Sequence, residues 1–210
     1  MKKAVIYTLL LASFLPIISC QKKIRTTAEL NKIFTQKEIS DINLLVDYFE
    51  EELLQFNSNI DSAYVDFFTK EEDIANGKVK FHYEKLTKVF NTIDQNTFDE
   101  IWQFNPGTYA SHPNNTVKFI NIAYEKKFHQ YIGELGKKNN TYKYLWERIN
   151  ASGSFPNFFT LQLLVFEVDT TSFQKVIINK DFSDFNKRVI IAMTTIKAID
   201  EENRREKWKD

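Results

Sequence analysis

The residue with the most reactive side chain in this sequence is Cys20, which is its only cysteine. A thiol is a stronger nucleophile than a hydroxyl, so it is the side chain here that is most easily modified. Cys20 follows a largely apolar run from Ala4 to Leu15 and a proline at position 16. About a dozen such residues fit a secretory signal and are too few for a comfortable membrane span. This setting predicts a modified cysteine rather than a catalytic one.

The segment that ends at Cys20 resembles the lipobox of bacterial lipoproteins. A short positive head of two lysines precedes the apolar run, and Ile17, Ile18 and Ser19 precede the cysteine. The resemblance covers residues 1–20. It implies cleavage between Ser19 and Cys20, attachment of diacylglycerol to the Cys20 sulfur, and acylation of the new amino terminus. Two alternatives remain open: an uncleaved apolar N-terminus with an incidental cysteine, and a secretory signal cut elsewhere.

The same resemblance implies a location in the bacterial cell envelope, where the lipid anchors the chain to a membrane. Gln21 stands where an aspartate tends to retain lipoproteins at the inner membrane, so its presence favours the outer membrane over the inner one, with the domain facing the periplasm. Lys22, Lys23 and Arg25 could contact anionic head groups, each contributing about 1 kcal/mol. The alternative is a soluble tether.

A division of the chain follows from this resemblance and from the first helical signal near Thr27. We expect a signal peptide over residues 1–19, a lipidated tether over 20–26, and a single helical domain over 27–210. A sub-division near 105–115 stays open, because the stretch NPGTYASHPNN is the longest irregular piece and could also serve as a binding loop.

The other residues with catalytic side chains form no recognisable motif. Glu125 and His129 are four positions apart and could share a helix face as metal ligands, but a surface ion pair is the simpler interpretation. We interpret His82 as a partly buried ring and His112 as a loop residue. Ser-Gly-Ser at 152–154 lacks the spacing of a nucleophile elbow and is typical of a helix end. We therefore predict no catalytic residue, no metal and no cofactor beyond the covalent lipid, and expect a protein that is not an enzyme.

An aromatic cluster at a loop is the candidate interaction patch. Phe155, Phe158 and Phe159 flank Pro156 and Asn157. If these rings are exposed, they form an apolar surface of the kind that binds a partner. If they are buried, they close the core between two helices.

Composition limits the classes of function and fold. Without Lys2 and Lys3 the chain carries 26 basic and 28 acidic residues, a net charge of −2, which argues against a nucleic-acid partner. The sequence has 19 Phe but only five Gly and four Pro, so it can build a large core yet has few tight turns. The scarcity of turn residues argues against an all-β sandwich.

Apolar periodicity predicts an all-α fold, an irregular bundle of about seven to nine helices. A capping box at Thr35–Glu38 opens the longest uninterrupted stripe. Residues 158–178 fit either a buried helix, which the helical neighbours favour, or a short β-hairpin that turns at Asp169–Thr171. The predicted helical stripes span residues 35–56, 79–93, 117–135 and 185–199, and shorter helices span 26–34, 62–70, 98–104 and 142–150.

These observations favour a lipid-anchored envelope protein with a non-enzymatic binding role, with an envelope protein as one candidate partner. The alternative is a carrier of a hydrophobic small molecule in a cavity lined by Phe-rich helices. An enzyme assembled from residues distant in sequence stays open, and a buried cluster of polar and titratable groups would support it.

Overall fold

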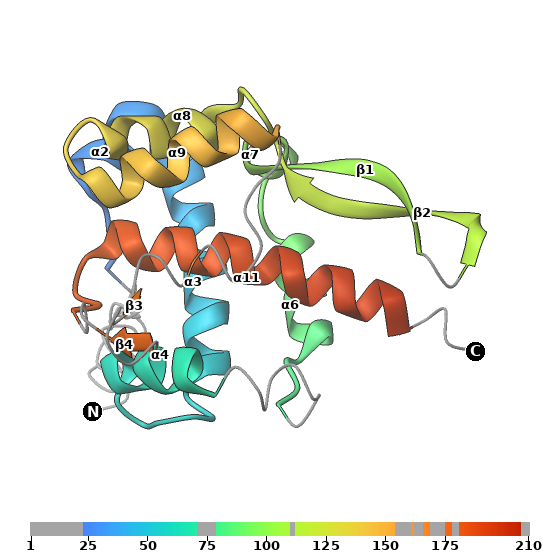
Figure 1. Cartoon of the computed structure of the whole chain (residues 1–210), viewed down its shortest axis with the longest axis horizontal. Helices are drawn as coiled ribbons and strands as arrows, with labels where there is room; N and C mark the ends of the chain where they lie inside the picture. Colours follow the sequence, from blue (N-terminus) through green and yellow to red (C-terminus); the bar gives the residue numbers. More distant parts are fainter. Residues whose placement is uncertain are drawn as a thin grey trace, which may run out of the picture.

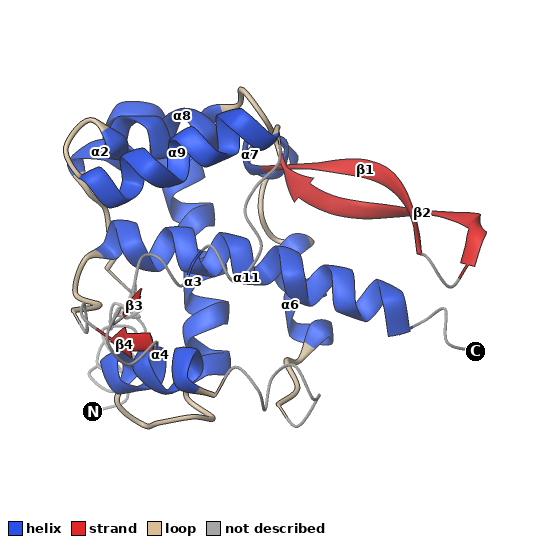
Figure 2. Cartoon of the chain, viewed as in Figure 1, coloured by secondary structure: helices blue, strands red, loops and turns tan. Residues whose placement is uncertain are grey.

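The computed structural model describes residues 23–70, 79–109, 112–153, 161, 166–168, 175–177 and 181–206, and most of these described residues are helical. The fold confirms the predicted all-α class (Figures 1 and 2). No helix within these ranges is both long enough and apolar enough to cross a bilayer. The eight helices described are α2 (Ala28–Ile33), α3 (Gln36–Leu53), α4 (Ile60–Thr69), α6 (Tyr83–Phe90), α7 (Gln95–Ile101), α8 (Lys127–Gly136), α9 (Asn140–Ser152) and α11 (Phe185–Glu206).

Helix α3 begins where the sequence predicts. The Thr35 side chain accepts a hydrogen bond from the Glu38 amide, and the Glu38 carboxylate accepts one from the Thr35 amide, so the predicted capping box is present. The apolar stripe of α3 is fully buried, including Ile39, Val46 and Phe49. Helix α2 begins one residue later than expected, because Thr27 rather than Thr26 caps it.

The core lies between α3 and α11, which cross near the centre of the molecule (Figure 1). Aromatic rings fill much of this space in edge-to-face pairs. Phe67 packs against Phe49, Phe56 and Phe68 at centroid distances of 5.5, 6.0 and 5.2 Å. Such pairs add about 0.5–1.5 kcal/mol each beyond the burial of their area. The described Phe residues therefore stabilise the bundle by packing on one another.

A β-hairpin projects from the helical body, where the sequence predicted helices and a loop (Figure 1). Strands β1 (Trp102–Tyr109) and β2 (His112–Ile122) pair antiparallel. The prediction of one helix over 117–135 is thus wrong up to residue 122, and the loop predicted at 105–115 is mostly strand. Glu125 has a φ of 63°, which a right-handed helix does not allow, so the chain turns there before α8 begins.

A second hairpin pairs β3 (Phe166–Val168) with β4 (Lys175–Ile177). These strands confirm the hairpin that the sequence left open within residues 158–178, so the favoured helix is wrong for these two segments. The predicted turn at Asp169–Thr171 lies outside the described residues.

Candidate functional site

A pocket of about 460 Å³ opens between α6 and the C-terminal half of α11. This volume is in the range of sites for small molecules, about 300–1,000 Å³. Polar side chains surround it, and buried carboxylates from α3 and α11 lie behind them. Its lining residues are His82, Tyr83, Glu84, Lys85, Lys88 and Asn203.

A buried carboxylate orients the histidine of the pocket. Glu52, near the end of α3, has a side chain that is only 1% exposed. It accepts a hydrogen bond from the His82 amide at 2.8 Å and lies 2.9 Å from Nδ1 of the same ring. Burial alone would raise the pKa of Glu52, but the hydrogen bonds from His82 and Lys85 outweigh it and lower this pKa. Glu52 is therefore held as a carboxylate.

Two lysines supply positive charge at the pocket. The Lys85 Nζ lies 3.2 Å from Glu52 Oε1, and its side chain is half exposed. Lys88, one turn further along α6, has no ion-pair partner among the residues that the structure describes. A lysine that lacks an internal partner can offer its three N–H donors to a ligand.

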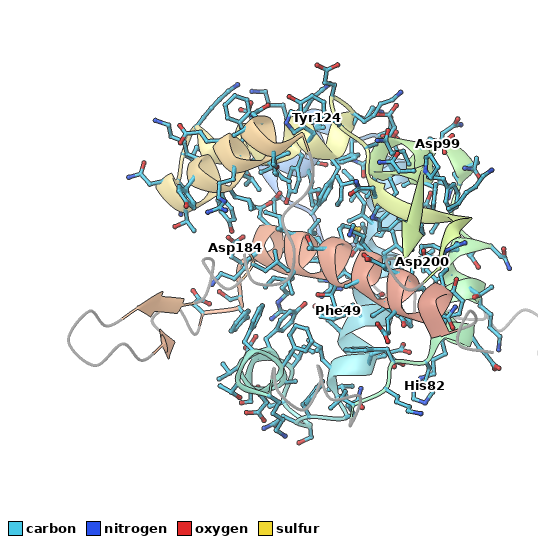
Figure 3. The ribbon with its side chains drawn as sticks, turned by 45° about the vertical axis from the view of Figure 1, so that its right-hand side comes forward. Phe49, His82, Asp99, Tyr124, Asp184 and Asp200 are labelled. Atoms are coloured by element: carbon cyan, nitrogen blue, oxygen red, sulfur yellow. The ribbon has the colours of Figure 1, made fainter. Side chains whose placement is uncertain are left out.

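A second buried carboxylate lies on the α11 side of the pocket. Asp200 on α11 is fully buried, accepts a hydrogen bond from the Tyr83 hydroxyl at 2.9 Å, and pairs with Arg204 Nε at 2.7 Å. Burial raises the pKa of Tyr83, and the negative charge of Asp200 raises it further, so the phenol stays protonated. Figure 3 shows His82 and Asp200 toward the same end of α11, with Asp184 at the other.

Two polar atoms near this cluster have no hydrogen-bond partner within the described ranges. They are the hydroxyl of Tyr48 and the side-chain amide nitrogen of Asn203, which lines the pocket. Tyr48 is 4% exposed, and its pKa is raised by burial and then by the Glu52 charge. Buried polar groups without partners are uncommon in proteins and are often satisfied by water or a ligand.

The arrangement can bind an anion more readily than it can perform catalysis. A histidine held by a buried carboxylate is the usual form of a general base. However, no further side chain in the described part of the chain hydrogen bonds to His82, so a nucleophile beside it would have to come from a bound substrate. The cationic lysines and the Asn203 amide are instead a donor set for carboxylate or phosphate oxygens.

The other histidine that the sequence singled out does not form the expected surface pair. Glu125 precedes α8 rather than sharing a helix with His129. His129 is buried, and its ring lies 4.6 Å from that of Tyr124 and 6.3 Å from that of Trp146. Burial lowers the pKa of His129, which favours a neutral ring. Groups of three or more metal-binding side chains are absent from the described residues.

The remaining sequence predictions for sites fall elsewhere in the chain. Ser19, Cys20 and the patch of Phe155, Phe158 and Phe159 lie outside the described residues. The prediction that His82 is partly buried is wrong, since its side chain is 68% exposed. Sequence reasoning missed Glu52 and Asn203. One signal for Glu52 was available, because it lies three positions after Phe49 and so falls beside the apolar stripe of α3.

Comparison with known protein families, with curated proteins and with solved structures finds no match to this chain. Its function is therefore inferred from the chemistry of the pocket and from the resemblance of its N-terminus to a lipobox.

Proposed function

We propose that this protein is a lipid-anchored protein of the bacterial cell envelope with a non-enzymatic binding role. Cys20 carries the lipid. Gln21 favours an anchor in the outer membrane over one in the inner membrane. The pocket around His82 is the binding site. The sequence ahead of Cys20 supports the anchor. The pocket supports the binding role, because side chains from α6 and α11 converge there in front of two buried carboxylates.

The ligand class follows from the donors in the pocket. Lys85 and Lys88 are cationic, and the Asn203 amide adds N–H donors that have no partner in the described ranges. Glu52 is already ion-paired with Lys85, so part of its charge is neutralised. A small molecule with a carboxylate or phosphate group is the ligand that this set fits. The observation that carries the proposal is Lys88, a cation at the pocket without an ion pair inside the described structure.

Calorimetry with citrate and with inorganic phosphate tests the binding site. We expect saturable binding of at least one of these anions, and a loss of about tenfold in affinity for Lys88→Gln, because a hydrogen bond to a charged group contributes about 1.5 kcal/mol or more. Lys126→Gln, an exposed lysine before α8, is the matched control and leaves affinity unchanged. No saturable binding of either anion, or equal affinity in both variants, contradicts the proposed site.

Mass spectrometry of the native N-terminus tests the anchor. A chain that begins at Cys20 with three acyl groups supports the lipid anchor, and an unmodified Cys20 contradicts it. The carrier alternative has no specific observation in its favour among the described residues, where Phe67 and its neighbours pack on one another. An envelope protein partner remains a prediction from the sequence.

A further inference from the structure

Arg25 fastens the beginning of the described chain to α3. Its backbone exchanges two hydrogen bonds with the Asn43 side chain, at 2.9 and 2.8 Å. Its guanidinium donates to both oxygens of Glu50, at 2.8 and 2.7 Å, and to Asp47 at 2.6 Å. It also lies 4.6 Å over the ring of Phe185 at the start of α11. We call these contacts the Arg25 clamp; they fix the chain at residue 25 to both central helices.

The clamp leaves a short connection to the lipidated residue. Cys20 precedes Arg25 by five positions, and five residues fully extended span about 17 Å. The lipid on Cys20 therefore cannot lie further than this from the Arg25 backbone. A domain held at such a distance rests against the bilayer instead of extending away from it.

Exposed apolar side chains flank the clamp. Ile24 is 48% exposed and immediately precedes Arg25. Leu44 is 39% exposed, follows Asn43, and lies one helical turn from Asp47, which binds Arg25. The charged groups of the clamp are ion-paired, because Arg25 binds Asp47 and Glu50, and Arg188 binds Glu50 and Asp61. This face therefore presents apolar side chains beside paired charges, and buried apolar area is what binds a protein surface to a bilayer.

We infer that the face formed by Ile24, Leu44 and the Arg25 clamp lies against the membrane, with Ile24 and Leu44 contacting the lipid. The inference rests on the proposed lipid anchor at Cys20 and adds the orientation of the domain. The occupant of this face is the bilayer, because the five positions between Cys20 and Arg25 keep the clamp within about 17 Å of the lipid anchor.

Nitroxide labelling of the lipidated protein in vesicles of phosphatidylethanolamine and phosphatidylglycerol tests the orientation. Since the lipid blocks the only native thiol, one introduced cysteine carries one label. The test positions are Ile24→Cys and Leu44→Cys. Phe104→Cys is the matched control, because Phe104 is also 48% exposed but contacts Arg204, about 28 Å along α11 from Phe185.

We expect labels at 24 and 44 to show a several-fold higher ratio of accessibility to oxygen over a water-soluble nickel chelate than the label at 104. Equally aqueous labels at 24, 44 and 104, on protein whose mass shows the lipid, overturn the inferred face and leave the anchor intact. A mass without the lipid overturns the anchor and this inference together. A native circular dichroism spectrum for each labelled variant shows that its accessibility ratio does not result from unfolding.

Discussion

At the scale of single residues, the pocket depends on a carboxylate that is both buried and ionised. Glu52 receives hydrogen bonds from the His82 amide and Lys85 and lies beside the His82 ring. Burying a charge is unfavourable unless it is paired, so these donors are what make the position tolerable. The pair also fixes the orientation of the His82 ring at the pocket.

Replacing Glu52 by Gln removes this charge. We expect a loss of about 1–3 kcal/mol in the free energy of unfolding near pH 7, because the donors of His82 and Lys85 lose a charged acceptor. The pKa of Glu52 is lowered by folding, so its contribution is present above the unfolded pKa and is lost as pH falls through the folded one. Urea denaturation should therefore show the difference in unfolding free energy between the two proteins shrinking as the pH falls below the ordinary carboxylate range.

Glu84→Gln is the control for this experiment. Glu84 lines the same pocket but is exposed, so its replacement should change stability by less than about 0.5 kcal/mol. If the difference in unfolding free energy between Glu52→Gln and the parent protein does not change as the pH is lowered, the effect is one of shape rather than charge.

The sequence could not reveal this cluster because its members are distant along the chain. Glu52 and His82 are 30 positions apart, and Tyr83 and Asp200 are 117 apart. Only the packing of α3, α6 and α11 brings them together. The sequence places His82 inside a predicted helix over 79–93 and without its partner, whereas in the structure it immediately precedes α6.

At the scale of elements, α8 and α9 pack closely because Gly133 has no side chain. A Cβ at residue 133 would lie 2.8 Å from the indole nitrogen of Trp146 on α9. Gly133 is a mid-helix glycine, which helix propensity alone disfavours by about 1 kcal/mol relative to alanine. The close approach of the Trp146 ring explains why glycine stands there.

We expect Gly133→Ala to lower the free energy of unfolding, because overpacking costs about 1–3 kcal/mol and exceeds the gain in helix propensity. In a Trp146→Leu background the same change should be neutral or stabilising by up to about 1 kcal/mol. A double-mutant cycle measured by urea denaturation checks both statements. Equal effects in the two backgrounds would contradict the assigned contact.

The elements that the sequence predicted well are those whose signal is local. The capping box at Thr35 and the stripe behind it define α3, and tertiary contacts only reinforce them. Strand β2 was misassigned because its apolar spacing also fits a helix, and its pairing with β1 is a non-local contact. The antiparallel pairing of β2 with β1, in which Ile122 lies opposite Trp102, decides in favour of strand.

At the scale of the whole molecule, the Arg25 clamp joins the N-terminal segment to α3 and α11. Arg25→Gln should lower the free energy of unfolding by about 1–3 kcal/mol, because Asp47 and Glu50 lose a partly buried cation. Arg25→Lys should be intermediate, since an ammonium cannot bridge two carboxylates in the planar geometry of a guanidinium. Chemical denaturation compares the three proteins.

In the Arg25→Gln protein, labels at positions 24 and 104 should show the same ratio of accessibility to oxygen over the nickel chelate in vesicles. Without the clamp, the N-terminal segment no longer holds the domain in one orientation. Arg25→Gln that is as stable as the parent chain would mean that solvent screens the clamp almost completely, and the orientation would then need another cause.

If the Arg25 clamp faces the bilayer as inferred, the clamp and the pocket lie on opposite sides of α3. Glu50 belongs to the clamp and Glu52 to the pocket, and two helical positions are separated by about 200° around the axis. With the clamp toward the bilayer, the mouth of the pocket looks away from it. A molecule dissolved in the lipid would meet the wrong side of the helix, whereas one diffusing in the periplasm would find the entrance unobstructed by the membrane.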